Sequence, residues 1–119
     1  MLTCPTIALL TFGMICSVQV ERVIDGDTFK AAFGEKTISV RVVGINTPER
    51  GEKGFVEATQ AAKEYFQGAT VTLHIGGAKS KRKGKCVGQT VMDKYGRVLA
   101  AVKDWPTVIS PWDKGPWCS

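Results

Sequence analysis

The sequence of 119 residues offers little that could hold a zinc ion or cross a membrane. It has one histidine, His74, and four cysteines that form neither a C-x-x-C pair nor a Cys/His spacing typical of zinc sites. The apolar run at 7–15 is too short to span a bilayer. The chain is also too short for two domains, although it can form one small domain with a single hydrophobic core.

Acidic residues are missing from one segment, "KSKRKGK" at 79–85. This segment carries Lys79, Lys81, Arg82, Lys83 and Lys85, whereas the rest of the chain balances eleven basic with eleven acidic residues. The net charge of +5 therefore comes from one basic segment. Such a segment is typical of a surface that binds a polyanion, and the alternative is a solvated loop that keeps the protein soluble.

Charge is also absent from the N-terminus, where the first charged side chain is Glu21. We interpret residues 1–17 as a candidate signal peptide with Ser17 near the cleavage point, which predicts an exported protein, secreted or periplasmic, rather than a cytoplasmic one. The alternative is that this segment, or its second half, forms the first buried strand. Cleavage near Ser17 would leave Cys86 and Cys118, either as a disulfide or as two free thiols.

The remaining pattern predicts a mainly β fold with one helix. Strands are expected at 18–24, 28–33, 37–45, 70–75 and 97–102, where apolar residues alternate or run continuously. Apolar residues at helical spacing predict a helix over 55–69, with Gly68 as the end signal. This order predicts a five-stranded OB-fold barrel with its helix between the third and fourth strands. We expect Phe55, Tyr65 and Phe66 to pack in the core.

The segment "IDGDTF" at 24–29 places two carboxylates, Asp25 and Asp27, at the junction of the first two strands. Residues two apart in an extended chain project to the same side, and Gly26 permits a sharp bend between them. Two like charges directed together indicate a cation, and oxygen ligands suit calcium or magnesium. "RVVGINTPER" at 41–50 and "DKYGR" at 93–97 then supply arginines and further polar groups near neighbouring strand ends.

Together, "VIDGDTFK", "VRVVGINTPER" and "DKYGRVLAAV" resemble the staphylococcal nuclease family, in the family's order and with a helix after the second motif. The resemblance runs from about Val18 to Val102, so we place a nuclease domain at 18–103 and a Trp/Pro-rich tail at 104–119. It implies hydrolysis of phosphodiester bonds in DNA and RNA with one Ca²⁺ ion, leaving 3′-phosphate products. We also expect a monomer that prefers single-stranded nucleic acid and binds no membrane.

The resemblance also implies roles for individual residues. The catalytic group comprises Arg41 and Arg97, which would hold the scissile phosphate, and Glu49, the proposed general base. The calcium ligands would be Asp27, Asn46 and the backbone carbonyl of Thr47, with Asp25 in support. Lys94 and Tyr95 would hold the terminal phosphate of the nucleotide, and the basic segment would add phosphate contacts.

Two departures from the family pattern keep a second function open. Asn46 stands where the family usually has aspartate, which removes one negative charge from the expected calcium site. We expect the tail at 104–119 to stand where the family usually has further helices after the last strand. The alternative to a nuclease is therefore an OB-fold module that binds nucleic acid with weak or no turnover.

Overall fold

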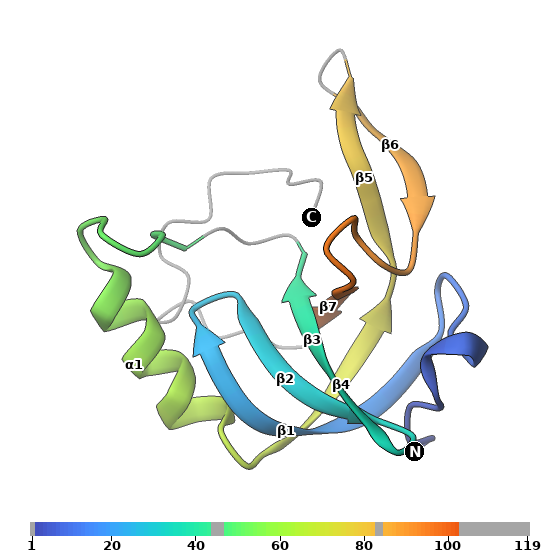
Figure 1. Ribbon diagram of the computed structural model, residues 1–119, viewed down its shortest axis with the longest axis horizontal. Coiled ribbons are helices and arrows are strands. Elements are labelled where there is room, and N and C mark those ends of the chain that lie inside the picture. Colours follow the sequence, from blue (N-terminus) through green and yellow to red (C-terminus); the bar gives the residue numbers. More distant parts are fainter. Residues whose placement is uncertain (1, 44–46, 83–84, 103–119) are drawn as a thin grey trace.

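In the computed structural model, the described residues 2–43, 47–82 and 85–102 form a closed five-stranded barrel with a projecting hairpin (Figure 1). For residues 78–82 and 85–87 only the backbone is described. The barrel strands are β1 (Ile15–Asp25), β2 (Thr28–Phe33), β3 (Lys36–Val42), β4 (Thr70–Ile75) and β7 (Val98–Val102). The predicted mainly β barrel is thus confirmed, with its single α-helix between β3 and β4.

The strands close in the order β1-β2-β3-β7-β4, and β4 pairs again with β1. All pairs are antiparallel except β3 and β7, which run parallel with Val40 opposite Val98. β1 closes the barrel because its first half pairs with β4 and its second half with β2. The parallel pair brings the motif that follows β3 beside the motif that precedes β7, although the two lie far apart in the sequence.

Alternating apolar residues fill the inside of the barrel. In β2, for example, Phe29, Ala31 and Phe33 are buried, as are Leu73 and Ile75 in β4. This is the period-two pattern of a sheet with one face turned to the core. Because the barrel interior is apolar, polar side chains can gather instead at the strand ends and in the loops.

Helix α1 (Phe55–Phe66) packs on β1 through Ala58, Ala62 and Phe66, which are all buried. It begins after Gly54, whose φ of 90° suits glycine, and the chain leaves it through Gly68 at φ 81°. The expectation for the helix aromatics is correct for Phe66 and wrong for Tyr65, which is 54% exposed. It is also wrong for Phe55, which lies outside the core cluster.

The N-terminal segment folds against the barrel before β1 begins. A short 3-10 helix, η1 (Ile7–Leu9), lies between Cys4 and Cys16, and these two cysteines form a disulfide inside the core. The Cys4 and Ser17 backbones are joined by a hydrogen bond of 2.8 Å. Residues 15–17 therefore belong to the first strand, as the alternative to a signal peptide expected for the second half of this segment. Cleavage near Ser17 stays a prediction. A cut there would remove this disulfide and the start of β1.

The basic segment forms part of a two-stranded sheet, β5 (Gly77–Arg82) and β6 (Lys85–Thr90), separate from the barrel. Figure 1 shows this hairpin projecting beyond the end of the barrel. It starts at Gly76, whose φ of 119° suits glycine and whose N–H donates to the Leu99 carbonyl at 2.7 Å. The described part of the charge-rich segment, residues 79–82 and 85, thus lies in paired strands rather than in a loop.

Three further expectations concern residues outside the described part of the chain. Asn46, Lys83 and the tail at 104–119 are among these residues, as is Cys118, so the Cys86–Cys118 pairing stays a prediction. In the described chain no helix is long and apolar enough to cross a membrane.

Candidate active site

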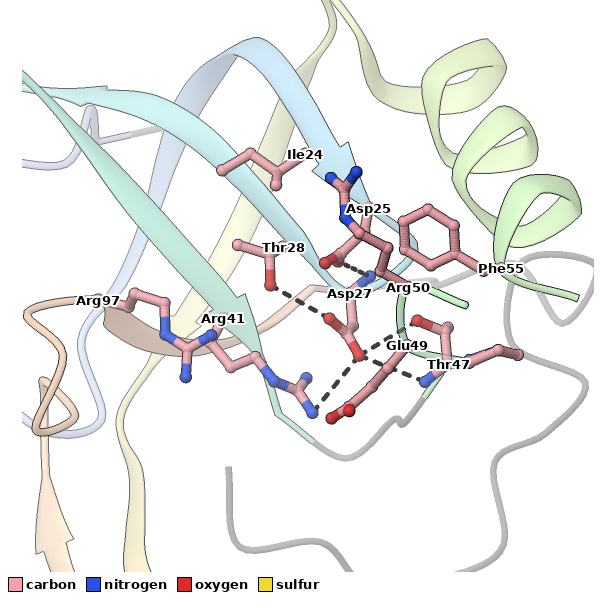
Figure 2. Close-up of a pocket in the computed structure, with 11 residues that line it drawn as sticks. Ile24, Asp25, Asp27, Thr28, Arg41, Thr47, Glu49, Arg50, Phe55 and Arg97 are labelled. Atoms are coloured by element: carbon pink, nitrogen blue, oxygen red, sulfur yellow. Dashed lines mark hydrogen bonds and ion pairs between the residues drawn. The ribbon is translucent and has the colours of Figure 1, made fainter. Parts of the chain in front are cut away.

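A pocket of about 430 Å³ lies where the β1–β2 turn meets the segment after β3 and the start of β7. It brings together six residues that the sequence analysis selected: Asp25, Asp27, Arg41, Thr47, Glu49 and Arg97. Figure 2 shows these side chains around one space, with the carboxylates of Asp25 and Asp27 between the two arginines and the start of α1. Three separate motifs therefore form one site.

Asp27 is the centre of the hydrogen-bond network. Its Oδ1 accepts from Thr28 Oγ1 at 3.1 Å, and its Oδ2 accepts from the Thr47 N–H at 3.3 Å and from Thr47 Oγ1 at 3.1 Å. Oδ2 also lies 3.5 Å from Arg41 Nη2. Asp27 thus joins β2, β3 and the segment after β3, and its position is fixed from three directions.

Thr28, which the sequence analysis did not select, is the neighbour that completes this network. A threonine directly after "DGD" was the available signal. The crowding around the turn shows in Gly26, where a methyl group would lie 2.7 Å from Thr47 Oγ1 and 2.9 Å from Thr47 Cβ and Cγ2. The absence of a side chain at Gly26 therefore allows Thr47 to pack directly over the β1–β2 turn.

The surroundings of Asp25 disfavour the charged form of its carboxyl group. Burial raises its pKa from 3.8 to about 6, and the hydrogen bond and like charge of Asp27 act in the same direction. Its Oδ1 accepts from the Asp27 N–H at 3.0 Å, which holds the turn closed. This hydrogen bond and the charge of Arg41 act to lower the pKa of Asp25, but burial outweighs them.

Arg41 in β3 and Arg97 directly before β7 bring positive charge to the pocket from two adjacent, parallel parts of the barrel. Burial lowers the pKa of Arg41, the carboxylate of Asp27 opposes this shift, and the charge of Arg97 adds to it. The Arg41 guanidinium also donates to the Val42 carbonyl. Two guanidinium groups within electrostatic reach of each other form a site for an anion.

Asp93, within the "DKYGR" motif, fixes the orientation of Arg97. Its carboxylate accepts from Arg97 Nε at 2.6 Å and from the N–H groups of Tyr95 and Arg97 at 2.9 Å each. Burial acts to raise the pKa of Asp93, but these hydrogen bonds outweigh it and lower the pKa. Asp93 was not among the predicted site residues, although an aspartate three residues before a glycine is a common signal for a turn closed by its side chain.

The other predicted site residues lie farther out. Tyr95 is 72% exposed and does not line the pocket, but its ring centre is 5.2 Å from both Lys94 Nζ and Arg97 Cζ. Glu49 is exposed on the pocket rim, in a turn closed by the Glu52 carboxylate, which accepts from the Glu49 N–H at 2.6 Å. Lys79, Lys81 and Arg82 lie in β5, and Lys85 lies in β6.

Whether these residues suit a calcium ion depends on their donor chemistry. Carboxylate and carbonyl oxygens at Asp25, Asp27 and Thr47 are the kind that hard divalent cations prefer. The two like-charged carboxylates of Asp25 and Asp27, close together at the β1–β2 turn, also favour a cation there. Among the described residues, however, no three His, Cys, Asp or Glu side chains cluster to hold a metal. The donor types therefore fit Ca²⁺, with a low count of charged ligands.

The comparison with known proteins adds one relative. An Escherichia coli protein named uncharacterized endonuclease is 31% identical to this chain over 84 residues, which is 71% of this chain and 46% of the relative. The chain therefore spans about half the length of that relative. No family model matches the chain.

Proposed function

We propose that this protein is a nuclease that hydrolyses phosphodiester bonds of DNA and RNA. The observation that carries the proposal is the pairing in one pocket of two arginines, Arg41 and Arg97, with the carboxylates of Asp25, Asp27 and Glu49. The name of the Escherichia coli relative supports a nuclease at the level of the reaction class. The resemblance to the staphylococcal nuclease family supports the finer proposal of 3′-phosphate products and calcium dependence.

In the proposed reaction, water attacks the phosphorus atom and the bond to the 5′-oxygen breaks. Negative charge increases on the phosphoryl oxygens in the transition state, where the guanidinium groups of Arg41 and Arg97 stabilise it. Glu49 accepts the proton of the attacking water. The leaving 5′-oxygen takes up a proton, so that the products are a 3′-phosphate and a 5′-hydroxyl.

One Ca²⁺ ion is part of the proposal. Asp27, Asn46 and the carbonyl of Thr47 would hold it, with Asp25 in support, and when bound it would supply positive charge beside the phosphate. Asp27 is positioned for this by Thr28 and Thr47, and the same contacts keep its carboxylate from turning away. The protein is proposed to act as a monomer on single-stranded nucleic acid in preference to duplex.

Export from the cytoplasm also remains a proposal. The Cys4–Cys16 disulfide supports export of a chain that keeps residues 4–16, because such bonds persist mainly in oxidising compartments and cleavage near Ser17 would remove both cysteines. Determining the N-terminal residue of the mature protein tests this proposal together with the predicted cleavage near Ser17.

The second candidate is a nucleic-acid-binding module without turnover. It is favoured by the low count of charged metal ligands among the described residues and by the neutral side chain of Asn46. The basic hairpin and the two arginines would serve binding alone equally well. The two candidates differ in whether Glu49 accepts a proton from an attacking water molecule.

A cleavage assay separates the candidates. Labelled single-stranded DNA is incubated with the protein in calcium, in magnesium and in chelator, and the products are resolved by length. We expect cleavage in calcium, and we expect Glu49→Gln to slow it by about two orders of magnitude while binding is retained. Glu57→Gln, an exposed residue in the first turn of α1, is the matched control. Binding without cleavage in any metal would establish the second candidate instead.

A further inference from the structure

Phe55 occupies an uncommon position for a phenylalanine. It is the first residue of α1 and lines the pocket, and it lies outside the cluster of buried and partly buried apolar residues that forms the core of the described chain. Phe66, at the other end of the same helix, is buried in that core. The ring of Phe55 therefore contributes to the wall of the pocket, where a ligand can reach it.

Arg50 and Ile24 complete this wall. Arg50 Cζ lies 5.7 Å from the centre of the Phe55 ring, a distance at which a cation and an aromatic face attract each other. Ile24 also lines the pocket and is 36% exposed. Figure 2 shows Arg50 and Phe55 at the end of the pocket opposite Arg41 and Arg97, with Asp25 and Asp27 between the two ends.

The charges of the pocket decide which part of a nucleic acid each end can accept. A strand offers anionic phosphates and neutral bases. Arg41 and Arg97 attract a phosphate to their end of the pocket, whereas the carboxylates of Asp25 and Asp27 repel any second phosphate beside them. At the other end the positive charge of Arg50 lies against the Phe55 ring. A strand that continues past the carboxylates towards Phe55 would therefore place a base there.

We propose that Phe55, with Arg50 and Ile24, forms a nucleobase subsite that stacks the base adjacent to the phosphate held by Arg41 and Arg97. This inference rests on the proposed function, because that function places the phosphate at the arginines. Any of the bases can occupy the subsite, since each has a π face. A base inside a duplex is stacked between its neighbours and must leave the helix to reach Phe55, so the subsite favours single strands.

The test combines changes in the protein with changes in the substrate. The protein forms are the parent, Phe55→Ala, Phe55→Trp and, as control, Tyr65→Ala, which removes an exposed aromatic ring of the same helix outside the pocket. The substrates are a short oligodeoxynucleotide and versions with a single abasic residue at each position in turn. Both kcat/KM for cleavage at one bond and equilibrium affinity by fluorescence anisotropy are measured.

For the parent protein, we expect loss of one base next to the cleaved bond to lower kcat/KM and affinity about tenfold. Phe55→Ala should cause a similar loss with the intact strand, and the abasic residue should then cost almost nothing more. Phe55→Trp should restore the sensitivity to the missing base, and Tyr65→Ala should behave like the parent. Melting temperatures identify any loss that comes from unfolding.

A Phe55→Ala protein that keeps the full sensitivity to every abasic position would overturn the subsite. If the parent binds the oligonucleotides but cleaves none of them, the proposed function fails while the affinity cycle still decides the stacking role. The two conclusions are thus separated by two readouts on the same set of proteins and strands.

Discussion

Gly26→Ala tests the packing that holds the site together. The added methyl group would lie 2.7 Å from Thr47 Oγ1 and 2.9 Å from two Thr47 carbons, and all three distances are shorter than van der Waals contact. Thr47 cannot simply move aside, because its N–H and hydroxyl both donate to Asp27 Oδ2. Relief of the clash should therefore displace the segment after β3 and weaken these hydrogen bonds.

The expected cost follows from these contacts. Overpacking of a buried site costs about 1–3 kcal/mol, and each weakened hydrogen bond adds roughly 0.5–1.5 kcal/mol when lost. We expect about 2–3 kcal/mol in total, which lowers the melting temperature by roughly 8–15 °C for a domain of this size. Because Asp27 and Thr47 are proposed calcium ligands, the calcium concentration for half-maximal cleavage should rise as well.

The assay is thermal unfolding with and without calcium, followed by cleavage of single-stranded DNA. Gly51→Ala is the matched control, since Gly51 has φ of 91° but no atom within 4 Å of the added methyl group. It should cost about 1 kcal/mol through its backbone conformation alone. Repeating Gly26→Ala in a Thr47→Ala background removes two of the three close contacts. An equal loss of stability in both backgrounds would refute the crowding argument.

Three further predictions concern other parts of the chain. Asp93→Asn should reduce the free energy of unfolding at pH 7 by about 1 kcal/mol and lower turnover, because Arg97 loses its ion pair. Hydrogen bonding lowers the pKa of Asp93, so its contribution to stability is present above the ordinary value of 3.8 and is lost as pH falls below it. Unfolding curves of the two forms should therefore converge in acid. Replacing the five basic residues at 79–85 by serine should weaken binding to all sequences alike, and the slope of log affinity against log salt should flatten by about 0.7 for each lost phosphate contact; an unchanged slope would mean that the hairpin only adds solubility. Reducing the Cys4–Cys16 disulfide, whose cysteines are 12 residues apart, should lower stability by about 3 kcal/mol, whereas a Cys4→Ala/Cys16→Ala protein should melt at the same temperature with and without reductant.

The sequence predicts the barrel well because its strands follow simple rules. The alternation in "TFKAAF" and "TVTLHI" fixes β2 and β4 at the expected bounds, and Gly68 marks the end of the helix region. The hairpin of β5 and β6 was not expected, since lysine, serine and glycine have low strand propensity and give no apolar alternation. The pairing of Cys4 with Cys16 could not be read from spacing, because four cysteines permit several connectivities.

The site residues were selected mainly by resemblance, and the fold explains why single motifs were insufficient. Arg41 and Arg97 meet only because β3 and β7 pair in parallel, a relation that no local pattern reveals. Thr28, Asp93 and Phe55 were missed for a different reason: a threonine, a turn aspartate and a helical phenylalanine are common in structural roles. Their positions next to Asp27, next to Arg97 and on the pocket wall required three-dimensional information.

The parallel pairing of β3 with β7 also has a consequence for the protein during its synthesis: the candidate site is complete only after the last barrel strand has been made. The ribosome delivers Asp27, Arg41 and Glu49 early, but the strand that carries the second arginine into place is the last strand of the barrel. A nascent chain that ends before β7 has the carboxylates without the paired guanidinium groups, and its barrel is open between β3 and β4. On the proposed function, cutting of nucleic acid cannot begin until the barrel is closed, so the topology itself delays the activity until the domain is complete.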